Sequence, residues 1–213
     1  MDLLHLLRQG DALTQGVALL LLAMSIASWV VILWKLWFLR RVARSAAQAI
    51  AAFWQAGSLE QARQQLPALE REPMVALLVE ATQPPPAGGL AASGDRAQQL
   101  TRSLRDALHR VSDQLQFGHV LLASVGAAAP FVGLLGTVWG IYHALAGLTG
   151  GGPVTLDQVA GPVGEALVMT AAGLGVALPA VLAYNVFNRR VARLEADLEG
   201  FARDLRDLLA GRA

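Results

Sequence analysis

The stretch from Val120 to Gly147, VLLASVGAAAPFVGLLGTVWGIYHALAG, carries no formal charge and lies in a longer charge-free run between Asp113 and Asp157. A helix needs about 20 predominantly apolar residues to cross the roughly 30 Å hydrocarbon core of a bilayer. The composition points the same way, because 54% of the chain is hydrophobic and only 15% is charged, where a soluble domain carries about 25% charge. We therefore predict that this stretch forms a transmembrane helix.

Two further apolar runs have the same character. Residues 16–33 carry no charge, and the run reaches Leu39 because the ammonium group of Lys35 can extend toward the interface. The third run, residues 158–188, contains one charged residue, Glu165. The start of the chain lacks the positive region of a secretory signal peptide, so we expect the first span to be retained. The sequence thus predicts an all-α membrane protein with three transmembrane helices, at residues 16–39, 119–147 and 158–188.

The basic residues near the ends of the spans predict their orientation. Lys35, Arg40, Arg41 and Arg44 follow span one, and Arg102, Arg105 and Arg110 precede span two. Arg189, Arg190 and Arg193 follow span three. The loop between spans two and three, residues 148–157, contains none. Because cytoplasmic loops are enriched in Lys and Arg, we predict that residues 40–118 and 189–213 face the cytoplasm. Residues 1–15 and the turn 148–157 then lie on the other side.

The region 40–118 has helical patterns interrupted by one strong break. Ser58 followed by Gln61 indicates the start of a helix. Pro73 can open a short helix over residues 74–81, because a proline is tolerated in the first helical turn. The run PPPAGG at residues 84–89 is followed by Ser93-Gly94, and such clusters mark loops. We predict a linker near residues 84–94.

Two apolar stripes at helical spacing adjoin the membrane runs. The first is Leu100, Leu104, Leu108, Val111 and Leu115, and the second is Leu194, Leu198, Phe201, Leu205 and Leu208. Because only Gly118 interrupts the first pattern, we predict one continuous helix that leads from the cytoplasmic region into span two. A C-terminal helix, residues 189–213, continues span three in the same way. The two extensions are expected to pack as a helical bundle.

The second and third spans carry small residues at helical spacing: Gly133, Gly136 and Gly140 in span two, and Gly173 and Gly175 in span three. Small side chains let helix backbones approach closely in a membrane, so these five glycines are predicted to pack helices together. Span one is instead rich in Leu, Ile and Val, with Trp29, Trp34 and Trp37 near its inner end. We predict a lipid-facing anchor with an aromatic belt at the interface.

Three polar residues within the spans are candidates for function: Thr137, Glu165 and Thr170. A charge at the bilayer centre costs about 2.5–3.5 kcal/mol, so Glu165 suggests a functional role, although a structural hydrogen bond or a position near the outer interface is the alternative. A membrane threonine often bonds the carbonyl one turn back, which is a purely structural role. Thr137 lies on the glycine-rich face, so its side chain can face either another helix or a pore. We expect His119 and His143, near span ends, to be interfacial rather than proton carriers.

The sequence lacks the residues that several functional classes require. The sequence has no cysteine, which excludes disulfides, thiolate metal sites and a cysteine nucleophile. It also has no zinc-protease motif, no glycine-rich phosphate loop and no nucleophile elbow. The net charge of +1 gives no field that would attract nucleic acid. We predict no enzymatic activity, no metal, no cofactor and no nucleic-acid partner.

The signature around span two resembles that of a known family. APFVGLLGTVWGI at residues 129–141 is similar to the second-span signature of the ExbB/TolQ/MotA proton-channel family. The segments AGPVGEAL (160–167), TAAGL (170–174) and PAVLAYN (179–185) resemble its third-span signature. MotA-like members have four spans, which disfavours that branch, and residues 140–145 and 156–165 look closer to ExbB than to TolQ.

The resemblance implies an inner-membrane proton channel in a bacterium, with a periplasmic N-terminus and a cytoplasmic C-terminus. It implies a homo-pentamer in which spans two and three surround the single spans of ExbD-like subunits, and a TonB-like protein that receives the energy for outer-membrane uptake of cargo such as iron–siderophores. Thr137 and Thr170 match the family's pore-lining threonines, and Glu165 matches its third-span glutamate. A TolQ-like subunit of the Tol-Pal envelope system and a passive scaffold for an ExbD-like partner are the alternatives.

Overall fold

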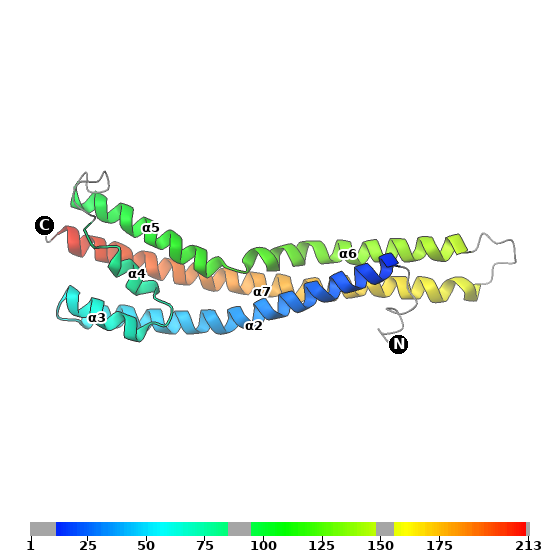
Figure 1. Ribbon diagram of the computed structural model, residues 1–213, viewed down its shortest axis with the longest axis horizontal. Helices are drawn as coiled ribbons and strands as arrows, with labels where there is room; N and C mark the ends of the chain where they lie inside the picture. The colour runs from blue at the N-terminus through cyan, green and yellow to red at the C-terminus, as the bar shows by residue number, and fades with distance from the viewer. Residues whose placement is uncertain (1–11, 85–94, 148–155, 212–213) are drawn as a thin grey trace. The chain divides into compact units, whose positions relative to one another are not determined.

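The computed structural model describes residues 12–84, 95–147 and 156–211, and every regular element in these ranges is an α-helix (Figure 1). In chain order the helices are α2 (Ala12–Gln55), α3 (Leu59–Leu69), α4 (Met74–Glu80), α5 (Arg96–Gln116), α6 (His119–Ala146) and α7 (Leu156–Ala210).

Three of these helices, α2, α6 and α7, are long enough and apolar enough to cross a membrane. This confirms the prediction of an all-α chain with three candidate transmembrane helices. The physical reason is that the bilayer core offers no water to the backbone, so a spanning segment must satisfy its own N–H and C=O groups. A helix does so within one segment, whatever the neighbouring chains provide.

The chain divides into two compact units. We call the first the apolar unit; it comprises the described residues among 1–34 and 118–186. The second, the extension unit, comprises the described residues among 35–117 and 187–213. Helices α2 and α7 contribute to both units.

The apolar unit is built from the first part of α2, all of α6 and the first part of α7. Its buried side chains are mostly small or branched, among them Leu21, Leu122, Ala129, Met169 and Ala180. Many large apolar side chains point outward, including Leu19, Leu20, Ile26, Phe131 and Leu182. Outward apolar side chains are normal where lipid replaces water, so the surface suits a bilayer or another apolar helix.

The extension unit has a core of its own. Both predicted stripes contribute to it, because Leu100, Leu104, Val111 and Leu115 of the first and Leu194, Leu198, Phe201 and Leu205 of the second are buried. The short helix α4 is surrounded almost completely, with five of its seven residues buried: Met74, Val75, Ala76, Leu78 and Val79. Phe53 and Phe201 meet edge to face at 5.1 Å between ring centroids. That this unit lies in the cytoplasm stays a prediction.

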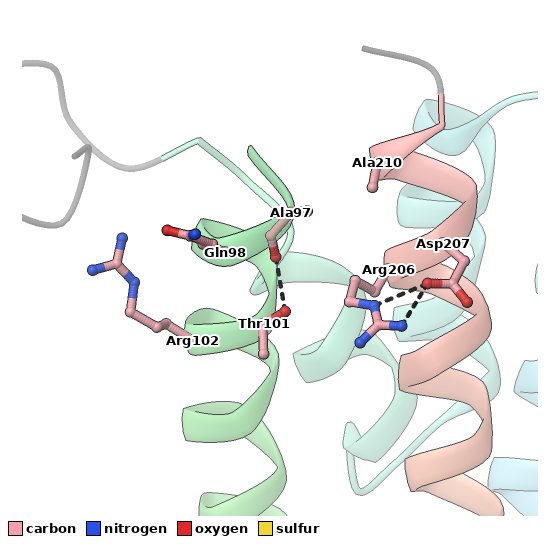
Figure 2. Close-up of a pocket in the computed structure, with 7 residues that line it drawn as sticks. All are labelled: Ala97, Gln98, Thr101, Arg102, Arg206, Asp207 and Ala210. Carbon is pink, nitrogen blue, oxygen red and sulfur yellow. Dashed lines mark hydrogen bonds and ion pairs between the residues drawn. The ribbon is translucent and has the colours of Figure 1, made fainter. Parts of the chain in front are cut away.

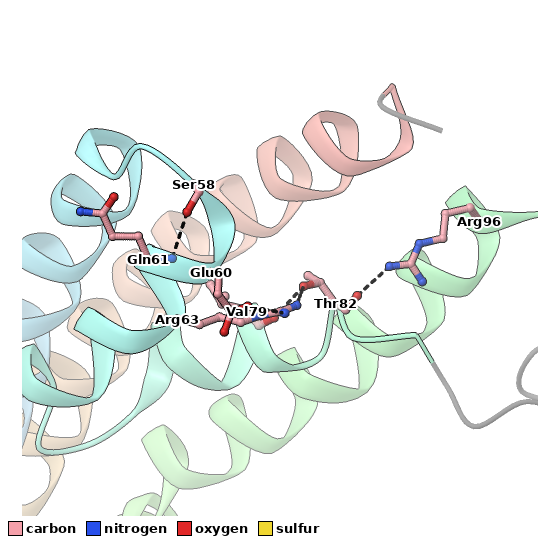
Figure 3. Close-up of polar contacts among 7 residues, drawn as sticks. All are labelled: Ser58, Glu60, Gln61, Arg63, Val79, Thr82 and Arg96. Carbon is pink, nitrogen blue, oxygen red and sulfur yellow. Dashed lines mark hydrogen bonds and ion pairs between the residues drawn. The ribbon is translucent and has the colours of Figure 1, made fainter.

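Capping contacts fix the ends of the short helices, as Figure 3 shows for α3 to α5. Ser58 is the N-cap of α3, and its hydroxyl accepts a hydrogen bond of 3.2 Å from the Gln61 N–H, which confirms the predicted start. Pro73 precedes α4, which ends at Glu80, one residue before the predicted end. Arg96, in the first turn of α5, donates to the Thr82 carbonyl at 2.7 Å and so ties α5 to the end of α4.

The predicted continuous helix from the extension unit into span two is wrong. α5 ends at Gln116 and α6 begins at His119, and between them Gly118 has a φ of 81°. This left-handed conformation interrupts a right-handed helix, and L-residues other than glycine rarely adopt it. A Cβ on Gly118 would also lie 2.9 Å from the Val31 Cγ1. Glycine is therefore the residue that lets the chain break here.

α7 is one uninterrupted helix of 55 residues, which confirms that span three continues into the C-terminal helix. It passes through Pro162 and Pro179 without ending. Three predicted segments lie largely outside the described residues: 1–15, the linker near 84–94 and the turn 148–157. Of these, residues 12–15 and 156–157 are helical, so α2 and α7 begin before the predicted spans 16–39 and 158–188.

Candidate functional site

The backbones of α6 and α7 come into direct contact at two glycines, Gly133 and Gly173. A Cβ added to Gly133 would lie 2.6 Å from the Met169 carbonyl oxygen, and a Cβ added to Gly173 would lie 2.6 Å from the Ala129 carbonyl oxygen. Real Cβ atoms do not approach carbonyl oxygens so closely. The two helices can therefore meet in this way only because both positions lack a side chain.

The contact continues along α6 in both directions. A Cβ on Gly140 would lie 2.8 Å from the Ala166 Cβ, and one on Gly136 would lie 3.0 Å from the Val17 Cγ1 of α2. Gly126, which was not singled out from the sequence, would place a Cβ 2.5 Å from the Val181 Cγ2. It lies seven residues before Gly133 and so on the same helix face, which is the signal that could have found it. Gly175 differs, because a Cβ there would meet no described atom within 4 Å.

This glycine contact brings two threonines together. The Thr137 hydroxyl donates a hydrogen bond of 3.0 Å to the Gly133 carbonyl. The hydroxyls of Thr137 and Thr170 are hydrogen-bonded to each other across the two helices. Thr137 is buried and Thr170 is half-buried. The sequence predicted each threonine separately, and the structure pairs them.

The hydrogen positions in this pair follow from simple counting. A threonine hydroxyl has one hydrogen to donate and two lone pairs to accept with. Thr137 uses its hydrogen on the Gly133 carbonyl, so Thr170 must be the donor in the bond between the hydroxyls. The Thr170 oxygen then retains acceptor capacity. Thr170 is half-buried, so part of this residue remains accessible.

Glu165 lies on α7 but apart from the threonine pair. It precedes Thr170 by five residues, which corresponds to about 7.5 Å along a helix and about 140° around it. Its side chain is exposed, and within the described part of the chain no hydrogen bond or ion pair is formed by it. A carboxyl group at span depth is costly when left unsatisfied in lipid. Its partner does not lie among the described residues.

The two histidines near the span ends take part in aromatic packing. His119 is buried and meets Tyr184 at 5.8 Å between ring centroids. His143 lies 4.8 Å from Trp139 and 5.7 Å from Tyr142. Whether either ring is interfacial stays a prediction. Among the described residues, no group of three or more His, Cys, Asp or Glu side chains could hold a metal ion.

An open groove of about 490 Å³ lies in the extension unit, between the start of α5 and the end of α7 (Figure 2). Two of its polar side chains form hydrogen bonds within their own helices: the Thr101 hydroxyl donates to the Ala97 carbonyl at 2.8 Å, and Arg206 donates to its neighbour Asp207 at 2.7 Å. None of the residues predicted from the sequence to form a site lines this groove. We do not assign it a ligand.

The segment that contains this site is shared with proteins of known name. The pattern of the MotA/TolQ/ExbB proton channel family matches residues 69–200, which include both threonines and Glu165. The chain is 42% identical to "Biopolymer transport protein ExbB" of Xanthomonas campestris pv. campestris (strain B100), over 94% of this chain and 83% of that protein. It is 39% identical to the protein of the same name from Neisseria meningitidis, over 96% of each. "Tol-Pal system protein TolQ" of Haemophilus influenzae is 40% identical over 53% of this chain and 49% of its own length.

Proposed function

The chain belongs to the MotA/TolQ/ExbB proton channel family, and on that premise we propose that it is the proton-channel subunit of a bacterial inner-membrane complex. The complex uses the proton motive force to energise TonB-dependent transport across the outer membrane, such as iron–siderophore uptake. The observation that carries the proposal is the hydrogen-bonded pair Thr137–Thr170, held between two helices that pack through glycine.

The extent of the similarities favours an ExbB-like role over a TolQ-like one. Two ExbB relatives match over 94% and 96% of this chain, whereas the TolQ relative matches over 53% and the ExbB protein of Salmonella typhimurium over 38%. The regions outside the shared channel segment therefore also resemble ExbB. Those regions include α2 and the start of the extension unit, where a partner-specific role would be expected.

We infer that the functional assembly is a homo-pentamer that surrounds the single spans of ExbD-like subunits. Thr170 and Glu165 support this, because both offer polar groups at span depth that this chain leaves accessible. Polar groups at that depth face a protein interior or a water-filled space rather than lipid. In this arrangement the N-terminus and the turn 148–157 are periplasmic. Residues 40–118 and 189–213, which include most of the extension unit, form a cytoplasmic helical bundle.

The chemistry of the threonine pair suits a proton that another subunit carries. A protonated carboxylic acid on an ExbD-like span can donate a hydrogen bond to the Thr170 oxygen, whose own hydrogen is committed to Thr137. Thr137 in turn is anchored on the Gly133 carbonyl. The pair can thus hold a neutral acid in the pore and release it once it ionises. One charge that moves through 100 mV gains about 2.3 kcal/mol, which is the energy source for motion.

The test is to remove each hydroxyl while keeping its shape. Thr137→Val and Thr170→Val should abolish energy-dependent siderophore uptake while the complex with its ExbD-like partner still assembles. Thr→Ser at either position should restore uptake, because the hydroxyl returns. Ser124→Ala is the matched control, since Ser124 is an exposed hydroxyl on α6, and it should transport normally. Normal uptake in both valine variants would refute the site assignment.

Two further measurements separate the alternatives. If the chain is a passive scaffold, purified complexes in liposomes should show no proton flux, with or without the valine substitutions. A TolQ-like role predicts that deletion of the gene causes detergent sensitivity, whereas an ExbB-like role predicts iron starvation. We expect iron starvation and a flux that both valine variants reduce.

A further inference from the structure

Three arginines and a tryptophan share one side of α2 within the extension unit: Trp37, Arg40, Arg41 and Arg44. In an α-helix these four positions lie within about 100° around the axis and about 10.5 Å along it. Trp37, Arg40 and Arg44 are exposed, and Arg41 is half-buried. We call these four residues the basic face.

The opposite side of this part of α2 packs against the protein. Phe38, Leu39 and Val42 lie on that side and are at most 7% exposed. Because the extension unit uses this side for its own core, the basic face is left for contacts with the surroundings of the chain.

The positive charges of the basic face are not balanced within α2, which contains no Asp or Glu. Arg40 and Arg44 are one helical turn apart, a spacing at which like charges destabilise a helix. Among the residues that the structure describes, no ion pair involves Arg40, Arg41 or Arg44. An anion from outside the chain would remove this repulsion.

The tryptophan holds one of the guanidinium groups in place. The Arg41 Cζ lies 5.0 Å from the centroid of the Trp37 ring, which is a cation–π contact. Tryptophan is enriched where a bilayer meets water, and the apolar run of α2 ends at Leu39, immediately before Arg40. The guanidinium groups are therefore expected at the depth of the lipid phosphates.

We propose that the basic face binds an anionic phospholipid, whose phosphate lies on the guanidinium groups of Arg40, Arg41 and Arg44. A guanidinium group offers paired N–H donors that match the oxygens of a phosphate. The apolar run that precedes Arg40 favours a lipid over an acidic protein segment, because the acyl chains of a lipid can lie along it. Binding of the lipid does not depend on the proposed transport function.

The test is native mass spectrometry of the full-length chain in detergent, with phosphatidylglycerol or phosphatidylcholine of the same acyl chains added. The wild type should bind the anionic lipid more tightly. Each arginine near an anionic lipid contributes about fivefold in affinity. The triple variant Arg40→Gln, Arg41→Gln and Arg44→Gln should therefore bind phosphatidylglycerol roughly a hundredfold more weakly. Equal affinity of the wild type for the two lipids would overturn the proposal and favour an acidic protein segment as the occupant.

Three arginines on α5 provide the matched control. Arg102, Arg105 and Arg110 are exposed, but Asp106 and Asp113 lie on the same side of that helix. Replacing these three arginines by glutamine removes the same amount of charge and should leave the affinity for phosphatidylglycerol close to that of the wild type. An equal loss in the two triple variants would show that total charge decides lipid binding, and it would overturn the proposal.

A single substitution decides the question if the triple variant on α2 does not accumulate. Arg44→Gln removes the arginine farthest from the apolar run and relieves the repulsion with Arg40. It should weaken binding of phosphatidylglycerol about fivefold and leave binding of phosphatidylcholine unchanged. Wild-type affinity for phosphatidylglycerol in Arg44→Gln would contradict the proposal.

Discussion

Gly133 and Gly173 face each other so closely that a Cβ added to Gly133 would lie 3.1 Å from the Gly173 Cα. The obstacle on each side is backbone, which cannot rotate away as a flexible side chain can. The threonine pair lies beside this contact, with Thr137 one turn after Gly133 and Thr170 one turn before Gly173. The glycines therefore set the distance across which the hydroxyls meet.

Gly133→Ala should destabilise the protein by about 1–3 kcal/mol, the usual range for overpacking a close contact. The expected result is a lower unfolding midpoint in detergent and a loss of transport, because the threonines are driven apart. Gly175→Ala is the control on α7, since a Cβ there meets nothing within 4 Å. Alanine favours a helix more than glycine does, so Gly175→Ala should not lose stability. Equal stability losses in the two variants would show that the contact at Gly133 does not decide the effect.

The unfolding free energy should depend on pH through Glu70. This buried carboxylate accepts hydrogen bonds from the Val75 and Ala76 N–H groups at the start of α4. Burial raises its pKa, and the two backbone hydrogen bonds oppose that shift only in part. The folded chain thus holds a proton more tightly than the unfolded chain does. Its contribution to stability is fully present below the unfolded pKa and is lost as pH rises through the folded pKa.

Thermal unfolding of the wild type should therefore rise in midpoint as the pH falls from neutral through the window just above the ordinary carboxyl range. Glu70→Gln should flatten that part of the profile. Glu80→Gln removes an exposed carboxylate from the end of α4 and serves as the control. Parallel profiles for the wild type and Glu70→Gln would contradict the prediction.

Ser112 and Glu195 join α5 to α7 within the extension unit through a hydrogen bond of 2.5 Å, and Gln116 donates to both side chains. Ser112→Ala should lower the unfolding free energy by roughly 1 kcal/mol, in the range of one net hydrogen bond. Glu199→Gln is the comparison, because Glu199 forms an ion pair of 3.7 Å with the exposed Arg203, and such pairs contribute little. A double-mutant cycle of Ser112→Ala with Glu195→Gln measures the coupling, and a coupling of zero would contradict the assignment.

Glu165→Gln should change transport but not the stability of the protein. Its side chain forms no hydrogen bond or ion pair with any described residue, so the unfolding midpoint of the isolated chain should stay unchanged. Siderophore uptake should be lost, since the carboxylate is proposed to act toward a partner subunit or pore water. Glu165→Asp should restore uptake in part. If uptake by Glu165→Gln equals that of the wild type, Glu165 has no role in the proton pathway.

Several features were predictable from local sequence because their causes are local. Ser58 and Gln61 cap α3 through neighbouring atoms, so their spacing alone indicates a helix start. The leucine stripes on α5 and α7 predicted the buried positions, because burial follows the helical period. The glycine stripe of span two predicted close packing. The sequence could not predict that Gly175 differs from Gly173, because that depends on which face of α7 meets α6.

The break at Gly118 was missed for a related reason. Glycine is compatible with a continuous helix and with a left-handed residue, so its presence does not choose between them. The residue that a side chain at this position would meet is Val31, which is more than 80 residues earlier in the chain. Lys35 itself was interpreted as a residue that reaches the interface. The structure places it inside the protein, bonded to the end of α5.

The sequence by itself determined that this chain has three long apolar helices and belongs to a proton-channel family. The reason is that lipid forces each apolar run to satisfy its own backbone, which depends only on length and composition. Only the tertiary structure decided that Thr137 meets Thr170, and that Lys35 is buried against the end of α5. Those relationships depend on the rotation and distance between helices, which are set by contacts among residues far apart in the chain.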